Sequence, residues 1–490
     1  MTVRYLDAIA AHARHAPDRL ALRDEHGDVS YGALWSAAER LAGGLRAKGV
    51  RPGDRVVTAL PPGAAQLAVM FGAMVAGAVA APLNVKLTRP EVRRYLDPVA
   101  PRLVVASAAH AELVDDPLVL ADPVAGPFDA LGPLLGEPGP RLSDVDPAAP
   151  AILFGTGGTT GLPKAGCWTH RSLWLYAAAC VGAMEVRRTD VELFFSPFFH
   201  IALVTGPFGT LFAGGACHFQ PGFDEAEVLR AVTGGTVTRF FGAPTALARL
   251  IDHPDCTPES TRAVRRILFG STRSEPDLPG RLRAAFPSAE LITGYGATEF
   301  GAVARLRSWE LVDGVDQGVG APVPGVDIRV VDPLGVESAA GEVGEIVVHA
   351  PWQITGYWGQ PLLDGGVRSG DLGFVDGDGY LHLRGRSKDL VITGGENVFP
   401  AEVEDALAQH PDIAEAAVFG RPDPDWGERV EAALVPRAGV ALDNDEVRAF
   451  CRERLAGYKV PKVFHVLDRL PLTATMKVDR RRLRELADGA

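Results

Sequence analysis

Hydrophobic and polar residues repeat along the first part of the chain with two different periods. Apolar positions recur at helical spacing in 5–15 and 31–48, which predicts amphipathic helices. Short apolar runs at 54–60 and 102–106 predict buried strands, and a longer run at 67–81, rich in small residues, predicts a buried helix. That run is too short to span a bilayer. Strands separated by helices predict a mostly parallel sheet with helices on both faces.

The pattern changes further along the chain. Residues 115–150 are rich in Pro, Gly and Asp, which predicts an irregular connection. Alternating segments at 326–331 and 344–349 lie between Pro and Gly turns and predict a small antiparallel β unit. A sharper break near residue 388 begins a stretch long enough for its own core, so we predict domains at 1–387 and 388–490. In the second domain we expect strands at 389–393, 413–419 and 430–435 and helices at 401–409 and 443–455.

Composition narrows the classes of protein that fit. The 490 residues are 47% hydrophobic, which argues against disorder, and a net charge of −12 gives no general attraction for nucleic acid. The cysteines are scattered without metal-ligand spacing, and residues 1–19 lack the charged-then-apolar order of a signal peptide. We therefore expect a cytoplasmic protein, a monomer or homodimer, that neither binds nucleic acid nor inserts into membranes.

One stretch, residues 154–165, combines the residue types that bind phosphate. Its glycines let backbone N–H groups approach an anion, its threonines add hydroxyl donors and Lys164 adds a positive charge. The stretch does not match the P-loop, because Ala165 follows the lysine, or the dinucleotide fingerprint, because Thr160 replaces its third glycine. The alternative interpretation is a flexible surface loop, since Gly and Thr are common in turns.

Further motifs downstream suit other parts of a nucleotide. Tyr295 lies between two glycines and can stack on a flat base, while Thr298 and Glu299 suit a phosphate and its Mg²⁺. Asp371 follows a glycine, and one carboxylate can accept hydrogen bonds from two ribose hydroxyls. The alternatives are a solvated carboxylate for Glu299 and a turn residue for Asp371. Near the end of the chain, Lys477 lies on a predicted loop tip.

In this order and at these separations, the motifs resemble those of the adenylate-forming superfamily, which includes acyl-CoA synthetases, luciferases and the adenylation domains of peptide synthetases. The resemblance covers residues 34–482, and the Gly-Gly-Glu-Asn-Val form of 394–398 most resembles the CoA ligases. It implies an α/β fold in which a large N-terminal domain, two helix-covered sheets plus a small β unit, is hinged at Lys388 to a small α+β C-terminal domain. It also implies ATP, Mg²⁺ and CoA as cofactors and co-substrates.

The resemblance also implies roles for single residues. Lys477 reaches the acid and the α-phosphate, Thr298 touches that phosphate, Glu299 holds Mg²⁺, and His200 gates the carboxylate of the acid. Tyr295 stacks on adenine, and Asp371 with Arg386 holds the ribose. The remaining nucleotide- and CoA-binding residues implied are Thr156, Gly157, Gly158, Thr159, Thr160, Gly161, Lys164, Ser271, Thr272, Gly296, Gly394 and Gly395. The acid pocket implied comprises Phe199, His200, Phe241, Gly242, Ala243, Gly270, Thr293 and Gly294.

Several residues depart from the family pattern. Gly157 replaces a serine, Ala165 and Met476 replace glycines, and Ser271-Thr272-Arg273 replaces small residues against adenine. None of these changes removes a charged group, so we expect adenylation to survive. His200 has the alternative interpretation of a packed histidine. The basic segment 480–482 can approach a nucleotide phosphate, although we expect a solvated helix face.

The leading hypothesis is an ATP-dependent ligase that adenylates a small aryl or acyl acid and transfers it to CoA. Residues 198–202 lack the Asp that amino-acid-activating relatives use, which argues against an α-amino acid. A second hypothesis is an adenylating enzyme with another acceptor, such as a carrier-protein thiol or an amine, or one that activates an inorganic oxyacid such as nitrite. The third is a nucleotide-binding protein without catalysis.

Overall fold

The computed structural model describes residues 3–121, 126–156, 164–271, 277–310, 318–473 and 478–488. The chain forms two compact units. The first unit comprises Met1–Ile328 and Val348–Val367, and the second comprises Arg329–Val347 and Arg368–Ala490. Within the described residues, no helix combines the length and apolar character that crossing a bilayer requires.

A six-stranded sheet in the first unit carries the predicted phosphate-binding stretch. Its strand order is β6-β5-β3-β4-β7-β8, with parallel pairs throughout except for the antiparallel pair β7–β8 at one edge. The apolar cluster beneath it includes Val57, Val104 and Leu153, all buried. The strands are β3 (Arg55–Ala59), β4 (Val79–Pro82), β5 (Leu103–Ser107), β6 (Leu118–Leu120), β7 (Pro150–Thr156) and β8 (Lys164–Thr169).

A nine-stranded sheet in the same unit has the order β15-β14-β13-β12-β11-β9-β10-β1-β2. Its central strands pair in parallel and its edges are antiparallel, as expected for an α/β sheet that ends in hairpins. The strands are β1 (Leu20–Asp24), β2 (Gly27–Ser30), β9 (Val191–Phe194), β10 (Ala216–Phe219), β11 (Arg239–Gly242), β12 (Arg266–Phe269), β13 (Glu290–Ala297), β14 (Gly301–Arg307) and β15 (Ala321–Pro322).

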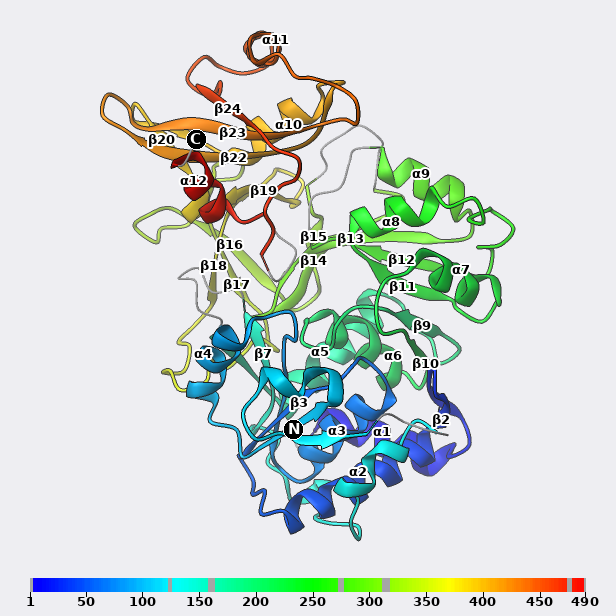
Figure 1. The fold of residues 1–490 in the computed structure, drawn as a ribbon. Coiled ribbons are helices and arrows are strands. Elements are labelled where there is room, and N and C mark those ends of the chain that lie inside the picture. The colour runs from blue at the N-terminus through cyan, green and yellow to red at the C-terminus, as the bar shows by residue number, and fades with distance from the viewer. Residues whose placement is uncertain are drawn as a thin grey trace. The chain divides into compact units, whose positions relative to one another are not determined.

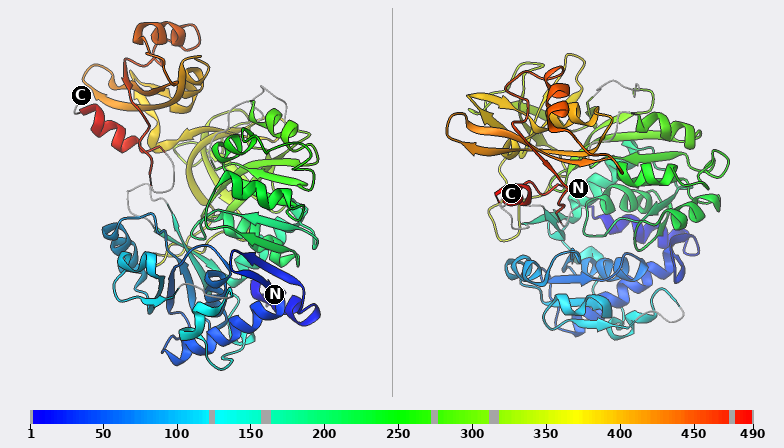
Figure 2. Two further views of the ribbon diagram at one scale, coloured as in Figure 1. Left: turned by 45° about the vertical axis from the view of Figure 1, so that its right-hand side comes forward. Right: turned by 45° about the horizontal axis from the view of Figure 1, so that its top comes forward.

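Helices cover these sheets, and α2, α5 and α7 begin at polar caps. The side chains of Ser30, Thr169 and Asp224 accept hydrogen bonds from backbone N–H groups in the first turns of α2, α5 and α7. The colours of Figures 1 and 2 follow the chain, and α7–α9 are drawn in green. The bounds of the α- and π-helices of the first unit are as follows. They are α1 (Tyr5–His15), α2 (Tyr31–Ala47), α3 (Ala64–Val75), α4 (Arg89–Val99), α5 (His170–Ala183), the π-helix η4 (Val204–Phe208), α6 (Gly209–Phe212), α7 (Glu225–Thr233), α8 (Pro244–Ile251) and α9 (Leu278–Ala285).

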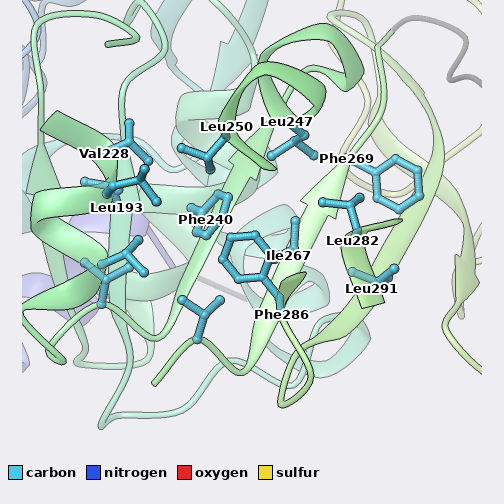
Figure 3. Packing of buried hydrophobic residues seen from close by; sticks show 14 of the residues in the cluster. Leu193, Val228, Phe240, Leu247, Leu250, Ile267, Phe269, Leu282, Phe286 and Leu291 are labelled. Carbon is cyan, nitrogen blue, oxygen red and sulfur yellow. The ribbon is translucent and has the colours of Figure 1, made fainter. Parts of the chain in front are cut away.

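One core fixes the strands that end at the candidate site. Val228 of α7, Leu250 of α8 and Leu282 of α9 pack against Phe240 of β11 and Ile267 of β12, and all five are almost fully buried (Figure 3). Burying side chains of this size stabilises a fold by about 1.5–3 kcal/mol each. The cluster therefore holds the carboxyl ends of β11, β12 and β13 in register.

The second unit contains two further sheets. Most of a four-stranded sheet, β16-β17-β18-β19, belongs to it, and a five-stranded sheet follows with the order β21-β20-β23-β22 and β24 paired to β23. The elements are β16 (Asp327–Val331), β17 (Gly344–His349), β18 (Val367–Val375), β19 (Leu381–Arg386), β20 (Val391–Thr393), β21 (Glu396–Val398), α10 (Pro400–Ala408), β22 (Ile413–Asp423), β23 (Gly427–Pro436), α11 (Asn444–Arg452), β24 (Val463–Val466) and α12 (Arg480–Asp488).

The predicted α/β fold class is confirmed, with several local corrections. The apolar run 67–81 is a helix only to Val75, because the chain turns at Gly77 and continues as β4. The connection 115–150 contains the short strand β6, which the prediction missed. The strand predicted at 389–393 begins only at Val391, because Asp389 ends a 3₁₀ turn formed by 387–389. The domain boundary predicted at 387/388 stays a prediction.

The basic segment at the start of α12 also needs a correction. Arg481 and Arg482 are exposed, as predicted for a solvated helix face. Arg480 is not: its side chain is only 21% exposed and pairs with Glu404 at 2.5 Å. It also donates to the carbonyl of Val418 at 2.9 Å. This arginine is therefore part of the packing of the second unit.

Candidate functional site

The two ends of the predicted phosphate-binding stretch lie side by side. Thr156 ends β7 and Lys164 begins β8, and the two residues are partners across the antiparallel pair. Thr156 is buried, whereas Lys164 is half-buried. The residues between them, which include Gly157, Gly158, Thr159, Thr160 and Gly161, lie outside the described residues, as do Thr272 and Lys477. Their predicted roles stay predictions.

Glu299 lies in the turn between β13 and β14, and three aromatic side chains hold that turn. Trp168 donates its indole N–H to the carbonyl of Thr298 at 3.0 Å, and Trp352 donates to the carbonyl of Phe300 at 2.8 Å. The hydroxyl of Tyr176 accepts the backbone N–H of Ala302 at 2.6 Å. The backbone on both sides of Glu299 is therefore fixed by buried donors and acceptors.

A segment that the sequence analysis did not single out connects Glu299 with Lys164. Residues 354–358, here called the strap, run beside β8, and the hydroxyl of Tyr357 donates to Oε1 of Glu299 at 2.9 Å. The ammonium nitrogen of Lys164 lies 5.0 Å from the centroid of the Tyr357 ring, within the range of a cation–π contact. The structure thus brings together a carboxylate and a cation that are far apart in the sequence.

The hydroxyl of Tyr357 remains a donor at neutral pH. Burial raises the pKa of Tyr357, and the negative charge of Glu299 raises that pKa further. No sequence signal identified this residue, because a tyrosine after glycine in a turn-rich segment has no fixed spacing from Glu299.

Tyr295 is held in β13 by a close hairpin. The residue is 6% exposed, and its ring lies tilted against that of Phe300 with the centroids 5.8 Å apart. A Cβ added at Gly294 would lie 2.2 Å from the carbonyl oxygen of Ala304, so this glycine is required by the pairing with β14. The flanking glycine Gly296 is required for the same reason, with the carbonyl oxygen of Gly301 at 2.4 Å.

The predicted acid-pocket residues gather at the carboxyl ends of three parallel strands. Gly242 of β11 is in register with Phe269 of β12, which is in register with Thr293 of β13. Gly270 and Ser271 follow β12 with φ angles of +154° and +66°. A serine in the left-handed region is strained, and such strain is concentrated at binding sites in proteins. Ligands of open α/β sheets bind at this edge.

His200 lies in the turn that precedes η4, beside half-buried Phe199. Its Nδ1 atom accepts the backbone N–H of Ala202 at 3.1 Å. A neutral ring in this arrangement carries its proton on Nε2. The Nδ1 contact therefore fixes which ring nitrogen carries the proton. Phe241 of β11 and Ala243 beyond it are also half-buried.

The second unit contains the other predicted nucleotide-binding residues. Asp371 of β18 and Arg386 of β19 are cross-strand partners, with the guanidinium Nε 3.0 Å from the carboxylate. Lys388 is exposed in the 3₁₀ turn that follows. Gly394 and Gly395 form the β20–β21 turn with φ angles of +59° and +83°, a conformation that favours glycine.

Comparison with known proteins covers nearly the whole chain. Residues 9–358 match the family model described as AMP-binding enzyme, and residues 402–477 match the AMP-binding enzyme C-terminal domain. The chain is 36% identical to a feruloyl-CoA synthase of Amycolatopsis sp over 484 residues, 95% of each protein. It is 32% identical to a fatty acid–[acyl-carrier-protein] ligase of Streptomyces coeruleorubidus over 497 residues, 97% of this chain and 94% of that protein.

A solved structure shares the fold over the same extent. The o-succinylbenzoate CoA synthetase of Bacillus subtilis, in complex with ATP and a magnesium ion, superposes with a TM-score of 0.86 and 28% sequence identity. The match covers 97% of this chain and 99% of that one. The resemblance read from the motifs is confirmed, and the chain belongs to the AMP-binding enzyme family of adenylate-forming ligases.

Proposed function

We propose that this protein is an AMP-forming acid–CoA ligase. The carboxylate of a small acid attacks the α-phosphorus of ATP, giving an acyl-AMP and pyrophosphate. The thiol of CoA then attacks the acyl carbon and releases AMP. The observation that supports this best is the Glu299 carboxylate, fixed by Tyr357 at 2.9 Å and joined through that ring to Lys164. A metal-binding oxygen and a phosphate-binding cation are what the first step requires.

The residues present fit a Mg²⁺–ATP complex. Magnesium is usually bound through one or two carboxylates together with substrate phosphates, so a single acid such as Glu299 suits it. Mg²⁺ supplies charge neutralisation on the phosphate oxygens when it is bound. Lys164 would neutralise charge on the β- and γ-phosphates, N–H groups of the preceding stretch would donate hydrogen bonds to them, and Asp371 would accept hydrogen bonds from the ribose hydroxyls.

The acid would occupy the edge formed by the ends of β11, β12 and β13. Phe199 and Phe241 supply apolar surface, and a Cβ added at Gly270 would meet no atom closer than 3.6 Å, so this glycine leaves space beside the strand ends. With Nδ1 accepting from Ala202, the Nε2 proton of a neutral His200 would donate to the carboxylate of the acid. We infer a flat or modest apolar acid, and a hydroxycinnamate of the ferulate type is the first candidate because a feruloyl-CoA synthase is 36% identical.

The acceptor is the finer part of the proposal. The side-chain-free turn at Gly394 and Gly395 suits the narrow arm of pantetheine, which CoA shares with carrier proteins. A carrier-protein thiol is therefore the second candidate, favoured by the 32% identity with a fatty acid–[acyl-carrier-protein] ligase.

Two assays test the proposal. Purified protein with ATP and Mg²⁺ should release pyrophosphate with one member of a panel of aryl, arylalkenyl and alkyl acids, with nitrite included as the inorganic alternative. CoA should then accelerate AMP release and yield an acyl-CoA thioester. A carrier protein that accelerates release where CoA does not would replace CoA as the acceptor. ATP binding without pyrophosphate release from any member of the panel would contradict an adenylating enzyme.

A further inference from the structure

Tyr357 occupies a position between two groups that the first half-reaction needs. Its hydroxyl donates to Oε1 of Glu299 at 2.9 Å, and the face of its ring lies 5.0 Å from the ammonium nitrogen of Lys164. The first contact acts on the carboxylate that suits Mg²⁺, and the second acts on the cation beside the phosphate-binding stretch. A single side chain therefore reaches both.

The strap gives Tyr357 little freedom to move. Cys167 donates its backbone N–H to the carbonyl of Gly356 at 2.9 Å, and Trp358 donates to the carbonyl of Ala165 at 2.8 Å. These bonds add the strap to β8, the strand that begins with Lys164. The strap also donates from the backbone N–H of Ile354 to the carbonyl of Glu299 at 2.8 Å. The backbone of Glu299 and the strand that begins with Lys164 are therefore both hydrogen-bonded to the strap.

A hydrogen bond at one carboxylate oxygen orients the remaining lone pairs of the carboxylate toward a bound cation. A carboxylate has about four acceptor positions, so one bond from a phenol fixes its plane and leaves positions for a cation. Hydrogen bonds to metal-ligating carboxylates orient them, and losing such a partner typically lowers metal affinity about tenfold or more. The ring acts on Lys164 differently: it holds the ammonium group by a cation–π contact and takes up none of its N–H donors in hydrogen bonds.

We propose that Tyr357 is a positioning residue that sets the Glu299 carboxylate for Mg²⁺ through its hydroxyl and the Lys164 ammonium for the ATP phosphates through its ring. This inference rests on the proposed function, because it assigns Glu299 to the metal. It adds a residue and two separable contacts to that site.

Substitution separates the two contacts. Tyr357→Phe keeps the ring beside Lys164 and removes the hydroxyl, whereas Tyr357→Leu removes both. The matched control is Trp358→Phe, because Trp358 is the next residue of the strap. Its ring centroid lies 5.2 Å from the guanidinium carbon of Arg55, so it serves neither Glu299 nor Lys164. Each protein is saturated with α,β-methylene-ATP and titrated with Mg²⁺ in a calorimeter, so that binding is measured without turnover.

We expect Tyr357→Phe to raise the Mg²⁺ dissociation constant about tenfold while the affinity for the nucleotide analogue alone stays unchanged. Tyr357→Leu should show the same loss for Mg²⁺ and also weaken binding of the analogue measured before Mg²⁺ is added. In turnover, excess Mg²⁺ should restore the pyrophosphate release rate of Tyr357→Phe, since a merely structural defect would not respond to metal. Trp358→Phe should bind both ligands as the wild type does.

Glu299→Gln distinguishes failure of this inference from failure of the site assignment. If Glu299→Gln weakens Mg²⁺ binding and Tyr357→Phe does not, the positioning role of Tyr357 is wrong and the site stands. If neither variant changes Mg²⁺ binding, Glu299 is not the metal ligand and both assignments are wrong. The double variant should be no weaker than Glu299→Gln alone, because the hydroxyl acts through that carboxylate.

Discussion

The histidines at positions 170 and 200 show how the environment of a single residue decides its chemistry. His170 begins α5 with its side chain fully buried, and neither ring nitrogen has a hydrogen-bond partner among the described residues. Burial, with a smaller contribution from Arg4, lowers the pKa of His170 to about 4. His200 is half-buried and uses Nδ1 as an acceptor. The first is a packed histidine, whereas the second is less buried and its Nδ1 atom is engaged by the local turn.

His170 predicts a loss of stability at mildly acidic pH. Its pKa is about 4 in the folded protein and close to 6.5 when the chain unfolds. Below pH 6.5 the unfolded chain takes up a proton that the folded protein refuses, so the free energy of unfolding falls as the pH falls. From pH 7 to pH 5, protonation of this residue in the unfolded chain should lower the free energy of unfolding by about 2 kcal/mol.

The control for His170 is a substitution that cannot titrate. His170→Leu keeps an apolar side chain in the buried position, and its melting temperature should fall less than that of the wild type between pH 7 and pH 5. An equal fall in both proteins would mean that other groups account for the acid sensitivity and that His170 does not contribute.

His200 predicts a selective loss of acid binding. In His200→Asn the amide oxygen can still accept the N–H of Ala202, so the local turn is kept and only the Nε2 donor is lost. A hydrogen bond to a charged acid is worth about 1.5–3 kcal/mol, so the KM for the acid should rise about tenfold or more. The KM for ATP, measured in the same pyrophosphate assay, should not change. Equal increases in both KM values would favour a packing role for this histidine.

At the scale of elements, the turn between β13 and β14 shows why Glu299 can be held so rigidly. Gly301 has a φ of +65°, and a Cβ added there would lie 2.3 Å from Cζ of Tyr176. That tyrosine cannot withdraw, because its hydroxyl also contacts Oγ1 of Thr205 in η4 at 2.8 Å. The turn that carries Glu299 is therefore connected to the π-helix that follows His200.

This packing predicts that two glycine-to-alanine substitutions at similar φ angles will differ in their cost to stability. Gly301→Ala combines left-handed strain with a clash and should lower the free energy of unfolding by about 3 kcal/mol or more. Gly53→Ala has a similar φ of +81° but no atom within 4 Å of the added Cβ, so it should cost only about 1 kcal/mol. Denaturant unfolding of both variants measures the difference. Similar losses would mean that the Tyr176 contact is not tight.

The sequence predicted these elements better than the contacts between them. Helix periodicity identified α1 to the residue, and the turn residues around 326–349 revealed β16 and β17. The sequence pattern could not reveal that the strap runs beside β8, because the β-bridge between Gly166 and Tyr357 joins residues almost two hundred positions apart. Hydrophobic period reports which face of an element is buried, not which partner covers it. The motifs singled out Lys164 and Glu299, and Tyr357, which contacts both, was missed.

For the whole molecule, the two half-reactions make opposite demands on one site. Adenylation requires a cation near the acid and the α-phosphate, whereas thioester formation requires an approach path for a thiol. We predict that the second domain supplies Lys477 for the first step and the turn at Gly394 and Gly395 for the second, turning about Lys388 between them. Conformational exchange of this kind lets one site serve two steps.

We expect two variants each to lose a different half-reaction. Lys477→Ala should slow pyrophosphate release by several orders of magnitude, because it removes the charge that stabilises the transition state, yet use preformed acyl-AMP and CoA nearly as well as the wild type. Gly395→Ala should do the reverse: no atom lies within 4 Å of the added Cβ, so folding loses only the about 1 kcal/mol of left-handed strain at φ +83°, whereas the methyl group obstructs pantetheine. Single-turnover assays of each half-reaction measure both effects. Because a rigid site would use the same residues throughout, loss of both half-reactions in either variant would contradict the exchange of residues between the two steps.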